Sequence, residues 1–315
     1  MRPILFPFAL SALLSACVTT TASSVSTFYD YHFTSPQGHP ISLAKLPSEL
    51  LTADIILVGE WHTHSAIHRF QTDILRQLND QGIPVTLSME QFSRDAQSIV
   101  DQYLAGDIGE QPLITEGNAW PNYESDYRPL MEYAKQNNLD VIAANAPKHL
   151  VRCIGRLGTP YVETLSQPQR QLIAQNIDTQ DSAYKRQFMS SMHHGISDQT
   201  ERMFAAQMSW DETMAESMIQ YLAAHPNKTI LHIAGKFHVQ QGLGLKTSLL
   251  KRNPDLNIAV ITPIGTQNAE ANITDNTAKD YLLWVLDPPA RFIKDENRIK
   301  AFQKLSHRND DLSCK

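Results

Sequence analysis

Six short runs of aliphatic and β-branched residues stand out along the chain, and longer segments with helical spacing separate most of them. The apolar runs cover residues 54–58, 84–89, 139–143, 229–234, 257–263 and 280–286. The first four lack polar alternation, as expected for strands that are buried on both faces. The intervening segments with helical spacing are 65–80, 128–137 and 200–224. Strands that alternate with helices predict an α/β fold with a largely parallel central sheet flanked by helices, plus a smaller helical portion.

Ionisable or amide side chains stand directly after the first four predicted strands. In chain order they are Glu60 and His62, then Glu90, then Asn145, and finally His238. Parallel strands place their carboxyl ends at one edge of the sheet, where open α/β sheets bind ligands. We therefore expect these side chains to meet in one site. The alternative for any single histidine is a hydrogen bond to neighbouring backbone.

This predicted cluster suits two kinds of chemistry. Two imidazoles with carboxylates form a ligand set for a divalent transition metal, and the predicted ligands are His62, His238, Glu60 and Glu90. A metal-bound water would then be activated for hydrolysis. Without a metal, the same groups together with Asn145 could carry general acid–base catalysis. His64 and His68 share one face of the following helix, and we expect them at the rim of the pocket.

A second group of candidate residues lies in segment 182–195. If this segment is helical, one apolar face is flanked by cations and followed by two histidines; the residues are Tyr184, Phe188, Met192, Lys185, Arg186, His193 and His194. Tyrosine, histidine and methionine are side chains that ligate haem iron, and lysine or arginine suits the haem propionates. The alternative is an amphipathic helix that packs its apolar stripe on the body of the protein.

The N-terminus has the pattern of a secretory signal. Arg2 precedes an apolar core at residues 4–14, and the following Leu-Ser-Ala-Cys resembles the lipobox of bacterial lipoproteins. We predict a lipoprotein signal peptide at residues 1–16, lipidation of Cys17, and a lipidated tether at residues 17–27. The residue after Cys17 is valine rather than an inner-membrane retention aspartate, which favours the outer membrane, facing the periplasm. A plain secretory peptide is the alternative.

The composition limits the remaining possibilities. With 42% hydrophobic and 19% charged residues the chain is globular, and we predict one α/β domain at residues 28–315 with a helical insertion around 150–225. The net charge is −6 without a basic block, which argues against a nucleic acid partner. Cys153 and Cys314 could pair in an oxidising periplasm and tie the C-terminal tail to the body, but spacing leaves this open.

Five stretches between residues 56 and 244 carry a family resemblance. In chain order they are ILVGEWHTHSAIHRFQTDILRQL, LSMEQFSRDAQSIVDQYLAG, YRPLMEYAKQNNLDVIAANAPKHLVRCIGRLG, FAAQMSWDETMAESM and IAGKFHVQQGLG. Together they resemble the ChaN-like haem-binding uptake lipoproteins of the Tiki/TraB superfamily. The superfamily pattern of two GxxH stretches with an intervening glutamate maps onto residues 59–62, Glu90 and residues 235–238, which include all the strand-end residues identified above except Asn145.

The resemblance implies haem as ligand, bound at a homodimer interface through a tyrosine. Tyr184 is the first candidate, and Tyr123 and Tyr127 follow it. Related branches of the superfamily resemble metal-dependent proteases or esterases. The leading hypothesis is therefore a lipid-anchored periplasmic protein for haem and iron uptake or storage, served by an outer-membrane haem receptor. The alternative is a metal-dependent hydrolase, a peptidase or esterase, that uses the strand-end cluster. A purely structural lipoprotein would leave that cluster unexplained.

Overall fold

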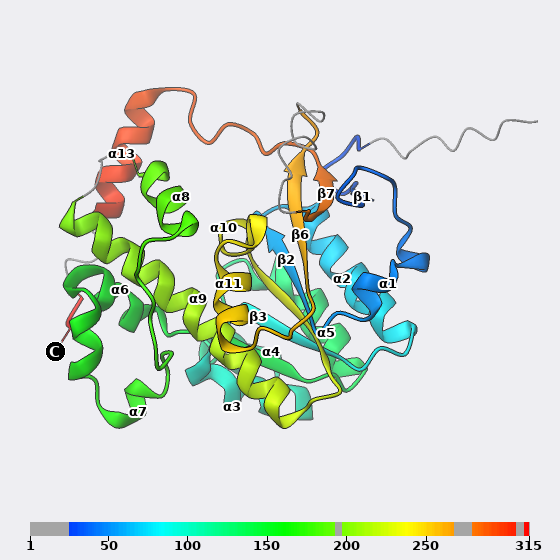
Figure 1. Ribbon diagram of the computed structural model, residues 1–315, viewed down its shortest axis with the longest axis horizontal. Helices are drawn as coiled ribbons and strands as arrows, with labels where there is room; N and C mark the ends of the chain where they lie inside the picture. The colour runs from blue at the N-terminus through cyan, green and yellow to red at the C-terminus, as the bar shows by residue number, and fades with distance from the viewer. Residues whose placement is uncertain (1–24, 193–196, 268–278, 307–311, 315) are drawn as a thin grey trace, which may run out of the picture.

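A seven-stranded mixed sheet forms the centre of the computed structural model, which describes residues 25–192, 197–267, 279–306 and 312–314 (Figure 1). The strand order is β1-β7-β6-β2-β5-β3-β4. Only the β1–β7 pair is antiparallel, and the other neighbours run parallel. The strands are β1 (His32–Thr34), β2 (Ile55–Glu60), β3 (Val85–Ser93), β4 (Val141–Asn145), β5 (Thr229–Gly235), β6 (Ile258–Gly265) and β7 (Tyr281–Val285). The predicted α/β fold with a largely parallel sheet is confirmed.

Strand β1 was not predicted, because three residues are too few to show a periodic pattern. It is placed by tertiary contacts: the ring nitrogen of Trp284 in β7 donates a hydrogen bond to Thr34 Oγ1 at 3.0 Å. Strand β3 also runs further than its apolar pattern indicates, because its pairing with β4 resumes at Ser93 after an irregularity that begins beyond Met89. Polar residues at the carboxyl end of β3 therefore remain part of the strand.

The predicted helix at residues 65–80 is present with the same bounds as α2, and α5 and α9 agree with their predicted segments within two residues. The helices are α1 (Ser48–Leu51), α2 (Ser65–Asp80), α3 (Gln97–Ala105), α4 (Glu110–Thr115), α5 (Arg128–Gln136), α6 (Lys148–Leu157), α7 (Gln167–Arg170), α8 (Ala183–Ser191), α9 (Asp198–Ala224), α10 (Lys236–Val239), α11 (Leu245–Arg252) and α13 (Asp295–Ser306). Short 3₁₀ segments are Leu43–Lys45, Arg94–Ala96, Thr159–Thr164 and Gln240–Gly242, and Tyr123–Tyr127 is a π-helical turn.

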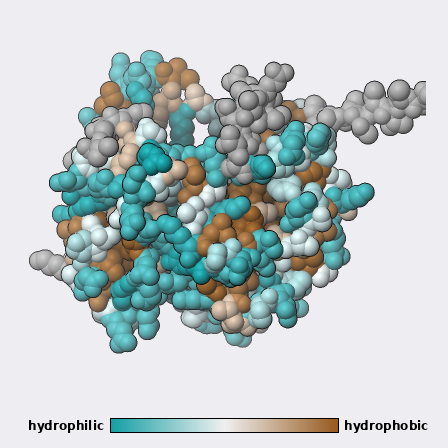
Figure 2. All heavy atoms as spheres, in the orientation of Figure 1, coloured by the Kyte–Doolittle hydropathy of each residue, from teal (hydrophilic) through white to brown (hydrophobic). Residues whose placement is uncertain are grey.

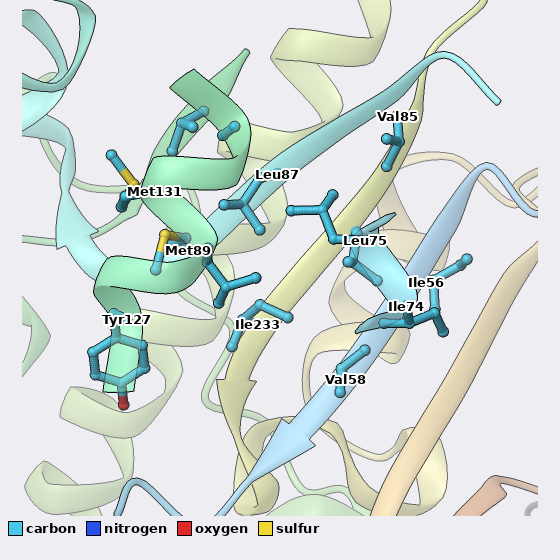
Figure 3. Close-up of a cluster of buried hydrophobic side chains, with 14 of the residues drawn as sticks. Ile56, Val58, Ile74, Leu75, Val85, Leu87, Met89, Tyr127, Met131 and Ile233 are labelled. Carbon is cyan, nitrogen blue, oxygen red and sulfur yellow. The ribbon is translucent and has the colours of Figure 1, made fainter. Parts of the chain in front are cut away.

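Two layers of helices cover the two faces of the sheet. Helices α2, α3 and α5 pack on one face, where aliphatic side chains of β2, β3 and β5 meet those of α2 and α5 (Figure 3). Helices α9 and α11 pack on the opposite face through residues such as Met214, Met218 and Leu249. Each fully buried side chain of this size contributes about 1.5–3 kcal/mol. The hydrophobic effect therefore fixes the sheet and the edge at which its parallel strands end.

A smaller helical portion, built from α6 to α8 and the first half of α9, has its own two apolar clusters. One cluster surrounds Cys153 of α6, which forms a disulfide with Cys314 across a Cα–Cα distance of 5.6 Å. The pairing that the sequence left open is thus present, and it ties the C-terminal residues to α6.

Several predicted features fall outside the described residues: the signal peptide, Cys17, most of the tether, His193 and His194. Among the helices that are described, none has the length and apolar character needed to cross a membrane.

Most of the face seen in Figure 2 is hydrophilic, and apolar residues also reach the surface over α13. The exposed apolar side chains of that C-terminal region are Phe292, Ile293, Ile299 and Phe302.

Candidate functional site

The strand-end site consists of Glu60, His62, Glu90 and His238, at or just after the carboxyl ends of β2, β3 and β5. Strand β5 lies between the other two, so its parallel neighbours deliver their last residues to the same edge of the sheet. Direct contacts join Glu60 to His62 and bring Glu90 close to His238. The structure therefore brings together the residues that the strand ends pointed to.

Glu60 is buried, and four side-chain donors surround its carboxylate. Its Oε1 accepts hydrogen bonds from His62 Nδ1 at 2.8 Å, Gln91 Nε2 at 3.1 Å and the Tyr127 hydroxyl at 2.6 Å. Its Oε2 accepts a hydrogen bond from Gln71 Nε2 at 2.7 Å. Burial alone would raise the pKa of Glu60, but the hydrogen bond from His62 and nearby imidazole charge hold it below its ordinary value. Because a carboxylate offers about four acceptor positions, Glu60 serves here as an anchor for its donors.

His62 is the accessible imidazole of the site, with 46% of its side chain exposed. Its Nδ1 is held by Glu60, and its ring meets the edge of Trp120 at a centroid distance of 4.9 Å. Burial lowers the pKa of His62, but the hydrogen bond that His62 donates to Glu60 and the charge of Glu90 outweigh that effect and raise it. No described residue forms a hydrogen bond with Nε2, so this nitrogen is open to a ligand.

Glu90 lies between the two histidines and against the backbone of β5. Its Oε2 accepts a hydrogen bond from the Gly235 amide at 2.6 Å, and its Oε1 lies 3.6 Å from His238 Nε2. A Cβ at position 235 would lie 2.8 Å from His62 Cε1 and 3.6 Å from Glu90 Oε2. Glycine at position 235 is therefore what allows the His62 ring to approach the strand end so closely, whereas Glu90 would lie at an ordinary contact distance from a Cβ.

His238 is buried, and its Nδ1 lies 2.8 Å from Oδ1 of Asp211 on α9. Burial alone would lower the pKa of His238, but the charges of Asp211 and Glu90 raise it to about 9. The imidazole is therefore protonated at neutral pH. Each histidine of the strand-end site is thus bound to a carboxylate through Nδ1 and directs Nε2 elsewhere.

Three further residues named from the sequence lie close to the site without facing it. The Asn145 side chain at the end of β4 contacts the neighbouring strand β3. Its amide nitrogen donates to the carbonyl of Glu90 at 3.0 Å, and its amide oxygen accepts from the backbone of Ala146 at 2.8 Å. His64 and His68 are buried, so their predicted position at the rim was wrong. His68 lies behind the site, 3.7 Å from Glu60 Oε2, and His64 binds the carbonyl of Leu286.

All three tyrosines proposed as haem ligands lie inside the protein, and Tyr123 is buried beside Phe92. Tyr184, on the predicted helix α8, is only 2% exposed, and its hydroxyl donates to Asp211 Oδ2 at 2.9 Å. Tyr127 is fully buried and donates to Glu60. Burial and the adjacent carboxylates raise the pKa of both phenols far above the ordinary value. In this conformation neither offers a phenolate oxygen to a ligand from outside.

The cations predicted beside Tyr184 are paired with acidic residues. Lys185 Nζ lies 2.7 Å from Glu201 Oε2, and exposed Arg186 pairs with Asp181 at 2.8 Å. The apolar part of the prediction is present, since Tyr184 and Phe188 pack with Phe204 and Met208 while Met189 and Met192 are partly buried beside them. The alternative given for this segment, an amphipathic helix packed on the body, describes what α8 does in the structure.

The described residues contain no group of three or more His, Cys, Asp or Glu side chains arranged to hold a metal ion. Glu60 is not available as a ligand because four donors occupy its oxygens, whereas both imidazoles are held at Nδ1 by carboxylates and keep Nε2 for another partner. The donors left over are the two Nε2 atoms and Glu90. Their arrangement suits hydrogen bonding and proton transfer with a small ligand.

Sequence reasoning missed the residues that hold the site in place, namely Gln71, Gln91, Gln207 and Asp211. Gln71 and Gln91 carry no signal that separates them from other glutamines. Asp211 does carry one: it lies three residues after Met208 and three before Met214, so an acid interrupts a buried stripe on a predicted helix. An acid at such a position requires a partner inside the protein.

Comparisons with known proteins agree with this architecture. Residues 46–249 match the family described as "Haem-binding uptake, Tiki superfamily, ChaN". The solved structure "Cofacial heme binding to ChaN of Campylobacter jejuni" is similar with a TM-score of 0.63 and 18% identity, covering 81% of this chain and 96% of that chain. A curated relative, "Protein RETICULATA-RELATED 5, chloroplastic" of Arabidopsis thaliana, is 25% identical over 146 residues. That match covers 43% of this chain and only 20% of the plant protein.

The family match spans well over half of the chain and includes every residue of the strand-end site. The chain belongs to the ChaN-like haem-binding uptake family of the Tiki superfamily. The likeness to the Campylobacter jejuni structure, at 18% identity, concerns the fold.

Proposed function

We propose that this protein binds haem and takes part in haem and iron uptake or storage as a homodimer. Membership of the ChaN-like family is the observation that carries this proposal. The similar Campylobacter jejuni protein is described as binding haem cofacially, which supports a stacked arrangement between two subunits. An outer-membrane haem receptor is the partner that we expect to deliver haem.

The residues around α8 fit haem in part. Partly buried Met189 and Met192, beside Phe237, provide an apolar surface that suits a porphyrin ring. The Tyr184 hydroxyl, in contrast, is committed to Asp211. Ligation by Tyr184 therefore requires that its hydroxyl leave Asp211 and lose its proton. When bound, haem would supply a ferric iron for the phenolate, and the propionates would compete for Lys185 with Glu201.

Haemin titration of matched variants tests the tyrosine assignment. We expect Tyr184→Phe to weaken haemin affinity at least tenfold and to remove the charge-transfer band of a phenolate ligand. His62→Ala is the control and should leave affinity and spectrum unchanged. A loss in Tyr127→Phe instead would move the ligand to Tyr127. Unchanged spectra in both tyrosine variants would refute tyrosine ligation by this part of the chain.

We also propose that Cys17 is lipidated and anchors the protein in the outer membrane, facing the periplasm. The support is the lipobox-like sequence that ends at Cys17. Mass spectrometry of the mature N-terminus should find acyl groups on Cys17, and Cys17→Ala should release the protein from the membrane fraction. An unmodified N-terminus after cleavage would favour the plain secretory alternative.

A second candidate function is hydrolysis of an ester or peptide bond at the strand-end site. One observation favours it: two imidazoles are each anchored to a carboxylate through Nδ1, and the Nε2 of His238 lies 3.6 Å from Glu90 Oε1. His62 Nε2 could remove a proton from attacking water, and protonated His238 could donate a proton to the leaving oxygen.

This second function is tested with p-nitrophenyl esters and a peptide library. We expect His62→Gln to lower the hydrolysis rate by about 100-fold, in line with the loss of a general base. His39→Gln is the matched control, because His39 lies on the β1 side of the sheet. Equal rates in both variants, or no rate above background in the wild type, would refute the hydrolase. Metal analysis of a His62→Ala, His238→Ala double variant tests the predicted metal.

A further inference from the structure

Asp211 stands out because its carboxylate is fully buried on α9, the helix whose Met214 and Met218 pack on the sheet. Burying an ionised carboxylate without partners costs far more than a single hydrogen bond returns. Asp211 does not follow a strand, and the haem hypothesis assigns it no role. The hydrogen bonds of its carboxylate indicate which side chains it holds.

Three polar side chains meet the Asp211 carboxylate. Its Oδ1 lies 2.8 Å from His238 Nδ1, and its Oδ2 accepts the Tyr184 hydroxyl at 2.9 Å. The Gln207 amide contacts both partners of the second hydrogen bond, because its Nε2 donates to the Tyr184 hydroxyl oxygen at 2.9 Å and lies 3.4 Å from Asp211 Oδ2. The carboxylate is therefore held in one orientation from α8 and from its own helix.

The position of the proton on His238 follows from these contacts. An ionised carboxylate can only accept, so a nitrogen 2.8 Å away must carry the hydrogen. Gln207 Nε2 also lies 3.0 Å from His238 Nδ1 and could donate only if that nitrogen were bare. These two arrangements exclude each other, and the shorter contact to a charged acceptor is the stronger one. The proton then belongs on Nδ1.

We propose that Asp211 is the positioning residue for His238, holding a proton on Nδ1 and turning the Nε2 edge toward Glu90 and the strand-end site. Glu60 holds His62 in the same way from the opposite face of the sheet. A ligand that fits between the two Nε2 edges is one that presents a carbonyl or similar acceptor oxygen to His238. The inference rests on the strand-end site acting in proton transfer, the second proposed function.

The test is a two-bond ¹⁵N–¹H correlation spectrum of the full-length chain labelled with ¹⁵N-histidine, recorded at neutral pH. This spectrum reports which ring nitrogen carries a proton, and loss of a signal in His238→Gln identifies His238. We expect a proton on Nδ1 in the wild type. A bare Nδ1, as in the arrangement with Gln207 as donor, would overturn the proposal without any variant of Asp211.

Variants of two adjacent acids on α9 distinguish the positioning of His238 by Asp211 from a general effect on the stability of the helix. Asp211→Ala should remove the proton from Nδ1, whereas Asp211→Asn retains an acceptor oxygen and should keep it. Glu212→Gln is the matched control, since Glu212 is the adjacent buried acid and pairs with Arg252 away from His238. An equal change in Glu212→Gln and Asp211→Ala would show a loosened helix and overturn the proposal. A wild-type Nδ1 proton without measurable hydrolysis would refute the second function and leave the positioning intact.

Discussion

Replacing Glu60 with glutamine should be strongly destabilising, because no orientation of the amide satisfies all the donors that surround it. Three of them converge on Oε1, and Gln71 Nε2 donates to Oε2. If the new carbonyl takes the Oε1 position, the new NH₂ faces the NH₂ of Gln71. Gln71 cannot simply turn over, since its oxygen is bound by His68 Nδ1 at 3.0 Å.

The size of the effect follows from the type of hydrogen bond. A bond to a charged group contributes about 1.5–3 kcal/mol and a neutral one about 1 kcal/mol, so weakening three bonds and breaking one costs about 3–6 kcal/mol. Removing a buried charge returns part of this, because its desolvation cost disappears. We therefore expect Glu60→Gln to lower the free energy of unfolding by about 3 kcal/mol.

Urea denaturation at neutral pH measures this difference. Glu110→Gln is the control, because Glu110 pairs with Arg128 at a partly exposed position where an ion pair contributes little to stability. If Glu60→Gln unfolds at the same urea concentration as the wild type, or differs no more than the control does, the reasoning about a saturated carboxylate is wrong.

Three further predictions concern other parts of the structure. Protonated His238, with its pKa raised to about 9, contributes stability that is fully present below its unfolded pKa near 6.5 and is lost as the pH rises through 9; the free energy of unfolding measured by urea denaturation should fall by a few kcal/mol over this range, and much less in Asp211→Asn. Cys314→Ser removes the disulfide that joins residues 161 positions apart, and it should lower the free energy of unfolding by up to about 5 kcal/mol. Reductant should have no further effect on the stability of this variant, and such an effect would contradict the prediction. Gly235→Ala should displace His62 and cost about 1–3 kcal/mol, whereas Gly109→Ala, with open space around its Cβ, should be nearly neutral; unchanged His62 signals in Gly235→Ala would refute this.

The fold was predictable because its strands and main helices are long enough to show their period. The run IILVG and the stripe along residues 65–80 each identify a buried element, and the alternation of such elements leads to a parallel sheet. Strand β1 lacks this signal, and its pairing with β7, together with the contact between Thr34 and Trp284, defines it.

The strand-end site was predictable only for residues that follow an apolar run of the sequence. Glu60, His62, Glu90 and His238 occupy such positions, although Glu60 ends β2 and Glu90 lies inside β3, so topology alone brings them together. Asp211 reaches the site from the middle of α9, and Gln71 from α2. Their approach depends on how helices pack on the sheet, which spacing in the sequence does not encode.

The position of Tyr184 could not be read from its neighbours either. Its cationic and apolar surroundings suit haem, yet the same amphipathic pattern packs the helix on the body and turns the hydroxyl to Asp211. A pattern on one helix does not reveal which buried acid on another helix will accept its hydroxyl.

The most direct test of the account is a visible absorption titration of the wild-type protein with haemin. We predict a shifted Soret band that grows to saturation at a fixed ratio of haemin to chain, as expected for a specific haem site. A linear, unsaturable increase with the spectrum of free haemin would contradict the proposal that this member of the ChaN-like family binds haem.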